Sequence, residues 1–231
     1  MSQTIKSIPL PLPFRLGSVN CYLVQAGAGY VLIDSGGANN RTRLEAELVG
    51  AGCRPGNLRL IVVTHGDFDH TGNCAYLRRT FGSKIAMHRQ DAPMAERGDM
   101  FANRKSGNAL LRIVGPVLFR FDKSDRFNPD VYLEDGDTLA EYGFDAQVIR
   151  IPGHSQGSLG ILTADGALFC GDLLENTDKP AFGSIMDDRM EANASLEKLV
   201  RYAITTVYPG HGTPFPMEML AQNYQAGGTS R

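Results

Sequence analysis

Four of the five histidines in this chain stand beside aspartate or glycine, and the grouped residues have the chemistry of a metal site. The residues concerned are His65, Asp67, Asp69, His70, His154, Asp172 and His211. Imidazole nitrogens and carboxylate oxygens are electron-pair donors that divalent metal ions use in proteins. A metal ion held in this way can activate water, so the residue types indicate metal-assisted hydrolysis.

The first histidine cluster follows a segment that has the pattern of a buried strand. Residues 60–64 (LIVVT) form a short apolar run with polar residues on both sides, which is typical of a strand covered on both faces. The run leads directly into His65. Glycines beside His154, Asp172 and His211 permit tight turns beneath these side chains. We therefore expect rigid strands to position the donors from strand ends.

Other segments predict two layers of strands with helices outside them. Residues 20–25 and 30–34 are apolar runs joined by a glycine-containing link, which predicts a hairpin, and residues 41–51 have the spacing of an amphipathic helix. Further helices are expected up to residue 81, at 195–203 and after Pro216, and further strands at 84–88, 131–133, 148–151, 159–162, 168–170 and 206–208. These elements fit most simply into one domain over residues 1–231, with two sheets packed face to face.

The composition excludes several functional classes. A formal net charge of −2 provides no cationic excess for nucleic-acid binding. No apolar run approaches the roughly 18–20 residues that cross a bilayer, and residues 1–13 lack the apolar stretch of a secretion signal. The four cysteines stand singly, which favours free thiols in a reducing compartment. We expect a cytoplasmic protein with neither a nucleic-acid nor a membrane partner.

The order of these motifs resembles the pattern of the metallo-β-lactamase superfamily. The similarity covers nearly the whole chain: Ile-Asp-Ser-Gly at 33–36, the cluster at 65–70, Gly-His-Ser at 153–155, Gly-Asp at 171–172 and Pro-Gly-His-Gly at 209–212. Several separated motifs in one order are far more specific than any single motif. The resemblance implies an α/β (α+β) fold, namely a four-layer αββα sandwich with a metal site at one edge.

The resemblance also implies which residues hold two divalent metal ions. The implied ligands are His65, Asp67 and His154 for the first ion, Asp69, His70 and His211 for the second, and Asp172 as a bridge between them. It further implies a catalytic role for Asp69, which would orient the attacking water and help to move its proton.

Asp67 departs from the usual family pattern, which has histidine at this position. A carboxylate adds a negative charge and a harder oxygen donor, so Fe²⁺ and Mn²⁺ become candidates beside Zn²⁺, the expected metal. Di-iron oxygen reductases of the superfamily carry glutamate there. Aspartate is also shorter than histidine, and a weakly bound or absent first ion, with Asp67 in a supporting role, is therefore an alternative.

The expected function is that of a metal-dependent hydrolase acting on a small ester, thioester or lactone. Two alternatives stay open, a non-haem (di-)iron oxidoreductase of the same superfamily and a non-catalytic metal-binding sensor. The expected partner is a small-molecule substrate, and a homodimer is one option for the assembly.

Several residues outside the ligand set have more than one interpretation. Residues 91–128 are expected to be an insertion that shapes the substrate pocket, although the helix-like apolar spacing of residues 110–121 also suits ordinary core. Asp34 is either a turn residue or a support for a metal ligand. His88 is expected to cap the end of a strand, and Cys170 is expected to be a buried packing thiol.

Overall fold

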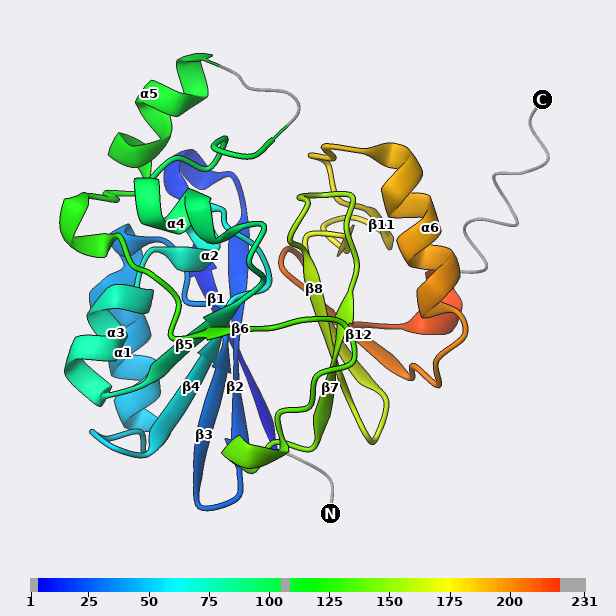
Figure 1. Ribbon diagram of the computed structural model, residues 1–231, viewed down its shortest axis with the longest axis horizontal. Helices are drawn as coiled ribbons and strands as arrows, with labels where there is room; N and C mark the ends of the chain where they lie inside the picture. The colour runs from blue at the N-terminus through cyan, green and yellow to red at the C-terminus, as the bar shows by residue number, and fades with distance from the viewer. Residues whose placement is uncertain (1–3, 105–108, 221–231) are drawn as a thin grey trace.

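The computed structural model of the protein describes residues 4–104 and 109–220. Two large β-sheets pack face to face, and helices cover their outer surfaces (Figure 1). The four-layer αββα arrangement expected from the sequence is therefore confirmed. No helix in the described ranges is long and apolar enough to cross a membrane.

The first sheet contains six strands in chain order. They are β1 (Ile5–Pro11), β2 (Ser18–Ala26), β3 (Gly29–Ile33), β4 (Leu58–Val62), β5 (Lys84–Met87) and β6 (Val131–Tyr132). The first three strands are antiparallel neighbours, and β3 to β6 run parallel. The expected hairpin is present as β2 and β3. The sequence reading missed β1, which contains Pro9 and Pro11; prolines are tolerated there because β1 is an edge strand.

The second sheet contains five strands in the order β13-β12-β9-β8-β7. Their bounds are β7 (Ala146–Arg150), β8 (Leu159–Thr163), β9 (Ala167–Gly171), β12 (Thr206–Pro209) and β13 (Phe215–Pro216). Strand β12 runs parallel to β9, whereas β7, β8 and β9 alternate in direction. A short ribbon of β10 (Leu174–Glu175) and β11 (Ala181–Phe182) stands apart from this sheet.

Helices connect many of the strands. They are α1 (Arg41–Gly50), α2 (Phe68–Thr71), α3 (Cys74–Phe81), α4 (Ala92–Arg97), α5 (Ala109–Leu118) and α6 (Arg189–Leu199), with 3₁₀ turns η1 (Pro13–Arg15), η2 (Ala38–Asn40), η3 (Lys123–Asp125) and η4 (Ala140–Tyr142). Helices α1 and α3 cover the first sheet and α6 covers the second (Figure 1). Helix α6 begins earlier than expected because Asp188 caps it, accepting hydrogen bonds from the amides of Met190 and Glu191. The helix expected after Pro216 begins at Met217 and otherwise falls outside the described residues.

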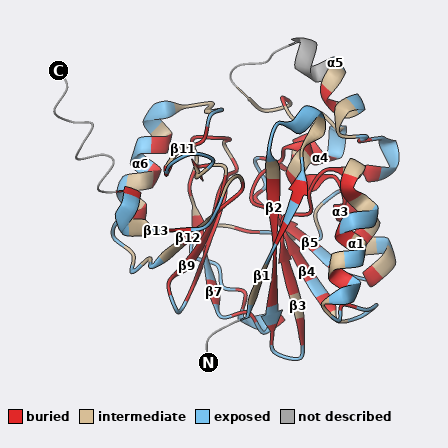
Figure 2. Cartoon of the chain, turned by 180° about the vertical axis from the view of Figure 1, so that it is seen from behind, coloured by how far each residue is buried: buried red, intermediate tan, exposed pale blue. Residues whose placement is uncertain are grey.

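Apolar side chains fill three interior layers between these four structural layers. Figure 2 shows that buried residues gather along the central strands. In β3, Leu32 packs toward α1 and α3, whereas Val31 and Ile33 pack toward the second sheet. In β8, Ile161 faces the first sheet and Leu162 belongs to the layer under α6. This two-residue alternation buries both faces of each sheet, so the central strands provide a rigid base for the loops that follow them.

Strand direction brings the sequence motifs to one edge of the sandwich. Asp34 follows β3, His65 follows β4, His154 follows β7, Asp172 follows β9 and His211 follows β12. Side chains from both sheets therefore meet at the carboxyl ends of these strands.

The segment 91–128 carries α4, α5 and η3 and lies beyond this edge of the first sheet (Figure 1). On α5, Ile113 and Val117 are exposed, with relative accessibilities of 74% and 75%. Phe121 is buried and its ring stacks on that of Phe68, with 4.6 Å between the centroids. The apolar stripe is therefore core in part only. The side chains of residues 110 and 111, which belong to the stripe, lie outside the described residues.

Candidate metal centre

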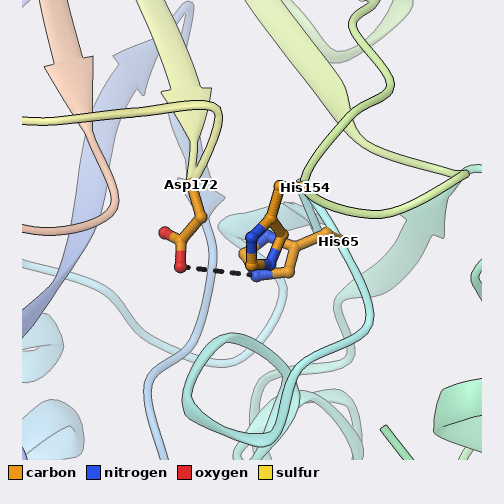
Figure 3. Close-up of side chains that lie close together, drawn as sticks. All are labelled: His65, His154 and Asp172. Atoms are coloured by element: carbon orange, nitrogen blue, oxygen red, sulfur yellow. Dashed lines mark ion pairs between the residues drawn. The ribbon is translucent and has the colours of Figure 1, made fainter. Parts of the chain in front are cut away.

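The structure brings the predicted donor residues together where the two sheets meet. Their potential ligand atoms form two groups, His65 with His154 and Asp172, and Asp69 with His70 and His211. Within each group the atoms lie within 4.8 Å of one another. Figure 3 shows the first group, with Asp172 facing the ring of His65. Asp67 lies beside the first group but belongs to neither.

Asp172 lies between the two groups, as a bridging ligand would. Its Oδ1 atom is 3.3 Å from Nε2 of His70, and its Oδ2 atom is 3.2 Å from Nε2 of His211 and 3.8 Å from Nε2 of His65. Asp69 completes the second group, with Oδ2 3.5 Å from Nε2 of His211. Ligand atoms bound tetrahedrally at about 2.0–2.2 Å lie roughly 3.4 Å apart, so the second group has the spacing of a metal site.

The Nδ1 atom of each of these four histidines faces an oxygen atom that orients the ring. The partners are Thr64 Oγ1 for His65 at 3.0 Å, Asp34 Oδ2 for His70 at 2.8 Å, the Ile185 carbonyl for His154 at 2.7 Å and the Ser18 carbonyl for His211 at 2.9 Å. A proton on Nδ1 satisfies each contact and leaves the lone pair of Nε2 directed into the site. Hydrogen bonds of this kind hold metal-binding histidines in the required tautomer.

Three buried polar atoms at this centre lack a hydrogen-bond partner. They are Nε2 of His65, Nε2 of His70 and Oδ1 of Asp172. Buried polar groups in proteins are nearly always paired, because an unpaired one carries the full cost of losing its hydration. All three atoms are electron-pair donors, so the donor set fits a divalent cation.

Asp34 supports the ligands and is not a simple turn residue. Its carboxylate accepts hydrogen bonds from the Thr64 amide at 2.8 Å and the Thr64 hydroxyl at 2.7 Å, besides the contact with His70. The residue is buried and has a φ of +58°, which is uncommon for a residue with a side chain. It therefore links the end of β4 to the ring of His70.

Arg104, which the sequence reading missed, fills the space beside Asp67. Its Nη2 atom donates to Oδ1 and Oδ2 of Asp67, at 2.7 and 2.8 Å, and lies 3.0 Å from Nε2 of His154. The side chain of Arg104 is only 3% exposed. Burial alone would raise the pKa of Asp67, but Arg104 and His154 outweigh it and hold that pKa well below its usual range. The one sequence feature that could have indicated a nearby arginine was Asp67 itself, because a buried carboxylate requires a cation.

Asp91, also missed, connects the loops that carry the ligands. It accepts hydrogen bonds from the Gly66 amide at 3.0 Å, the Ser155 hydroxyl at 2.6 Å and the Gly157 amide at 2.8 Å. The side-chain amide of Asn103 adds a fourth bond at 3.1 Å. One carboxylate thus fixes the His65 loop, the His154 loop and the residue before Arg104. Nothing in its sequence neighbourhood signals this role.

Two residues take the structural roles expected for them. His88 is buried, and its Nδ1 atom accepts a hydrogen bond from the Gln90 amide at 3.2 Å, which caps the end of β5. The Cys170 thiol is buried among packed side chains, and burial raises its pKa to about 12.

The pKa values of the second group reflect close packing of acids and bases. Burial lowers the pKa of His211, but the charge of Asp172 and a hydrogen bond to it raise that pKa to about 9. Burial raises the pKa of Asp69, and the neighbouring carboxylates of Asp172 and Asp67 raise it further. The charges of His70 and His211 lower this pKa but do not cancel the rise.

A pocket of about 700 Å³ opens onto this centre. Its lining includes Asp69, His154, Asp172 and His211 together with the apolar residues Leu12, Leu16, Met100, Leu118, Phe119 and Ile185. Three of the apolar residues come from the segment 91–128, so this segment contributes to the pocket wall. The arrangement places a polar reaction centre beside an apolar binding surface.

Comparison with known families decides what kind of protein this is. The family model described as the metallo-beta-lactamase superfamily matches residues 14–211. The chain belongs to the metallo-β-lactamase superfamily. The membership expected from the sequence is therefore confirmed, and so is the expectation of a metallohydrolase, because named relatives are hydrolases.

Individual members of the superfamily resemble the chain at modest identity. The acyl-coenzyme A thioesterase MBLAC2 of Bos taurus is 29% identical over 225 residues, which cover 89% of this chain and 78% of that protein. The hydroxyacylglutathione hydrolase GloC of Haemophilus influenzae is 26% identical, covering 71% of this chain and 70% of that protein.

Solved structures of superfamily members share the fold. A metallo-β-lactamase family protein of Thermus thermophilus superposes with a TM-score of 0.72 at 24% identity, covering 96% of this chain and 79% of that one. The protein TTHA1623, solved in a di-iron-bound form, gives a TM-score of 0.70 at 27% identity, covering 92% of this chain and 97% of that one.

Proposed function

We propose that the protein is a metal-dependent thioesterase that hydrolyses small acyl thioesters with an apolar acyl group. The observation that carries this proposal is the pocket of about 700 Å³, in which apolar side chains lead to the cluster of metal-ligand candidates. Two relatives support it, because one is named an acyl-coenzyme A thioesterase and the other a hydrolase of acylated glutathione.

The second group of donors, with Asp172, would hold the divalent ion. Asp69, His70, His211 and Asp172 provide two imidazole nitrogens and two carboxylates at the spacing described above. A divalent ion in this position supplies Lewis acidity, which activates water and polarises a carbonyl group. Zn²⁺ suits this donor set, and Fe²⁺ and Mn²⁺ are also compatible with it.

Asp69 is the residue of this group that we assign to proton transfer. It lines the pocket beside the other donors of the group, where the attacking water would be bound. A carboxylate in this position can accept a proton from the attacking water and deliver a proton to the departing sulfur atom. The leaving thiol is therefore released in protonated form.

The apolar wall would bind the acyl chain and exclude water from it. Leu16, Leu118 and Ile185 line the pocket from three separate loops or helices. Each methylene group buried against such a surface contributes about 0.8 kcal/mol, which corresponds to roughly fourfold in affinity. We therefore expect preference to rise with acyl length until the pocket is filled.

A reconstitution experiment tests the proposal. The purified protein is stripped of metal with a chelator, reloaded separately with Zn²⁺, Mn²⁺ or Fe²⁺, and assayed on acyl-coenzyme A, acylglutathione, a lactone and a β-lactam. We expect metal-dependent hydrolysis of the thioesters, and we expect His70→Ala to lose it while remaining folded. Thioester hydrolysis by the metal-free protein, or its absence with every metal, would contradict the proposal.

The same assays separate the two alternative functions. An iron-dependent oxidoreductase is favoured by one observation, the similarity to a protein solved with two irons. It would show activity with Fe²⁺ alone, accompanied by consumption of oxygen or of a thiol. A metal-binding sensor would bind the ion and turn over none of the substrates.

A further inference from the structure

The first metal position of this chain contains a side-chain cation. We infer that the guanidinium group of Arg104 takes the place of the first ion, so that the protein holds one divalent ion, at the position formed by Asp69, His70, His211 and Asp172. This inference rests on the proposed metal-dependent function and specifies how its centre is built.

The contacts of Arg104 overlap the volume that a first ion would need. An ion bound by Asp67 and His154 must lie about 2.0–2.2 Å from a carboxylate oxygen and from Nε2. Nη2 of Arg104 already lies between these groups, 2.7 and 2.8 Å from the Asp67 oxygens and 3.0 Å from Nε2 of His154. The guanidinium group and an ion cannot occupy this space together.

Hydrogen bonding also indicates that the second metal position, and not the first, is the one that binds an ion. Nε2 of His154 is engaged in either protonation state, since a neutral ring accepts from Arg104 and a protonated ring donates to Asp67 at 3.2 Å. Nε2 of His70 and Oδ1 of Asp172, by contrast, face each other at 3.3 Å without forming a hydrogen bond. At the first position the unpartnered atoms are Nε2 of His65 and Nε of Arg104, and of these only the histidine nitrogen can donate an electron pair to a metal ion. The second position is therefore the one whose donor atoms need a cation.

The charge at the first position is balanced by side chains alone. Asp67 is anionic, and Arg104 supplies the cation that pairs with it at 2.7 Å. A divalent ion added beside the guanidinium would place two cations at short range in a buried site. Repulsion between them is strong where water does not screen it.

Arg104 is held in this place by its neighbour in the chain. Asn103 donates hydrogen bonds to the carboxylate of Asp91 and to the Gln90 carbonyl. Asp91 also binds the Gly66 amide and the Ser155 hydroxyl, in the loops that carry Asp67 and His154. The arginine and the residues that it contacts are therefore fixed to one another through a single carboxylate.

Metal counting tests the inference without reference to catalysis. Metal-free protein is titrated with Zn²⁺ by calorimetry and its bound metal is measured by mass spectrometry, for the wild type, Arg104→Ala, Arg104→Lys and Arg54→Ala. Arg54 is a matched control because it is exposed and precedes β4, at the end opposite His65. We expect one tightly bound ion in the wild type, Arg104→Lys and Arg54→Ala, and two in Arg104→Ala, since its first position gains free donors.

The outcomes are distinguishable from failure of the proposed function. Two tightly bound ions in the wild type, or one in a folded Arg104→Ala variant, would overturn the inference and leave the hydrolase assignment untouched. Absence of thioester hydrolysis in a one-ion protein would overturn the function alone. If Arg104→Ala does not fold, the electron paramagnetic resonance spectrum of Mn²⁺-loaded wild type decides: an isolated ion supports the inference, and a coupled pair refutes it.

Discussion

The Nδ1 atom of His70 lies 2.8 Å from Oδ2 of Asp34, so a residue from the end of β3 fixes the tautomer of a ligand that follows β4. This contact predicts the effect of Asp34→Asn. Asparagine tolerates the positive φ of the position and can still accept from the Thr64 amide. Its NH₂ group, however, would face the Nδ1 proton of His70. The ring would then carry its proton on Nε2, and metal affinity should fall about 10- to 100-fold.

The affinity of Asp34→Asn is measured by competition with a chromophoric chelator. Asp165→Asn is the control, because Asp165 lies in the turn between β8 and β9, at the end of β9 opposite Asp172. Wild-type affinity in Asp34→Asn would show that Asp34 does not set the tautomer of His70.

Gly210 provides a test of where Asp172 must sit. A Cβ atom at this position would collide with Oδ1 of Asp172 and lie 2.9 Å from Cε1 of His70. Gly210→Ala should therefore displace the carboxylate, and we expect weaker metal binding with little change in secondary structure. Gly50→Ala, where a Cβ would meet nothing within 4 Å, is the matched control. Unchanged metal affinity in Gly210→Ala would mean that Asp172 is not a ligand in this position.

The regular elements could be predicted from local pattern because burial and periodicity determine them. The hairpin of β2 and β3 follows from two apolar runs and the glycine-containing link between them, and the helix α1 follows from its apolar spacing. Strand β1 could not be predicted from local pattern. Its two prolines are acceptable only at a sheet edge, and whether a strand lies at an edge depends on the tertiary fold. The early start of α6 depends on Asp188, which is one of several polar residues that precede the apolar spacing.

The acyl-binding wall predicts a change in chain-length preference. Leu118→Ser removes apolar surface from the pocket, so kcat/KM for a medium-chain acyl thioester should fall about fivefold or more. We expect little change in kcat/KM for the corresponding acetyl thioester. Val49→Ser on the distant helix α1 is the control, since Val49 is an exposed apolar residue that does not line the pocket. Equal losses for both substrates would contradict a role for Leu118 in binding the acyl chain.

Metal binding should release protons in the neutral range. The pKa of His211 in the metal-free protein is about 9, above its usual value, because Asp172 and Asp69 stabilise the charged ring against the effect of burial. The ring is therefore protonated at pH 7 and must lose that proton before Nε2 can bind an ion. Affinity should rise about tenfold per pH unit for each proton that is lost, and the part due to His211 should level off above pH 9. The rise is steeper where His70 is also protonated, because Asp172 and Asp34 raise the pKa of His70 against the effect of burial.

Calorimetry in buffers of different ionisation enthalpy measures the released protons. The same pKa shift stabilises the folded metal-free protein fully below about pH 6.5, and this contribution is lost as the pH rises through about 9. Metal binding without proton release at pH 7 would show that His211 is neutral there or is not a ligand.

The candidate site was predictable where its residues follow the family order, and unpredictable where the chain departs from it. The motifs identify the donors near His65, His154 and His211, because these stand at the ends of buried strands. Arg104 lies in a segment without strand or helix pattern, and only folding brings it to Asp67. The expected role of Asp67 as a ligand to a first ion is a prediction that its pairing with Arg104 disfavours.

A stoichiometric titration tests whether a single ion is sufficient for hydrolysis. Metal-free protein receives Zn²⁺ in small increments, and hydrolysis of an acyl thioester is recorded at each step. We expect activity to rise in proportion to the first equivalent and to stay constant through the second. Activity in the metal-free protein, or activity that appears only with the second equivalent, would contradict this expectation.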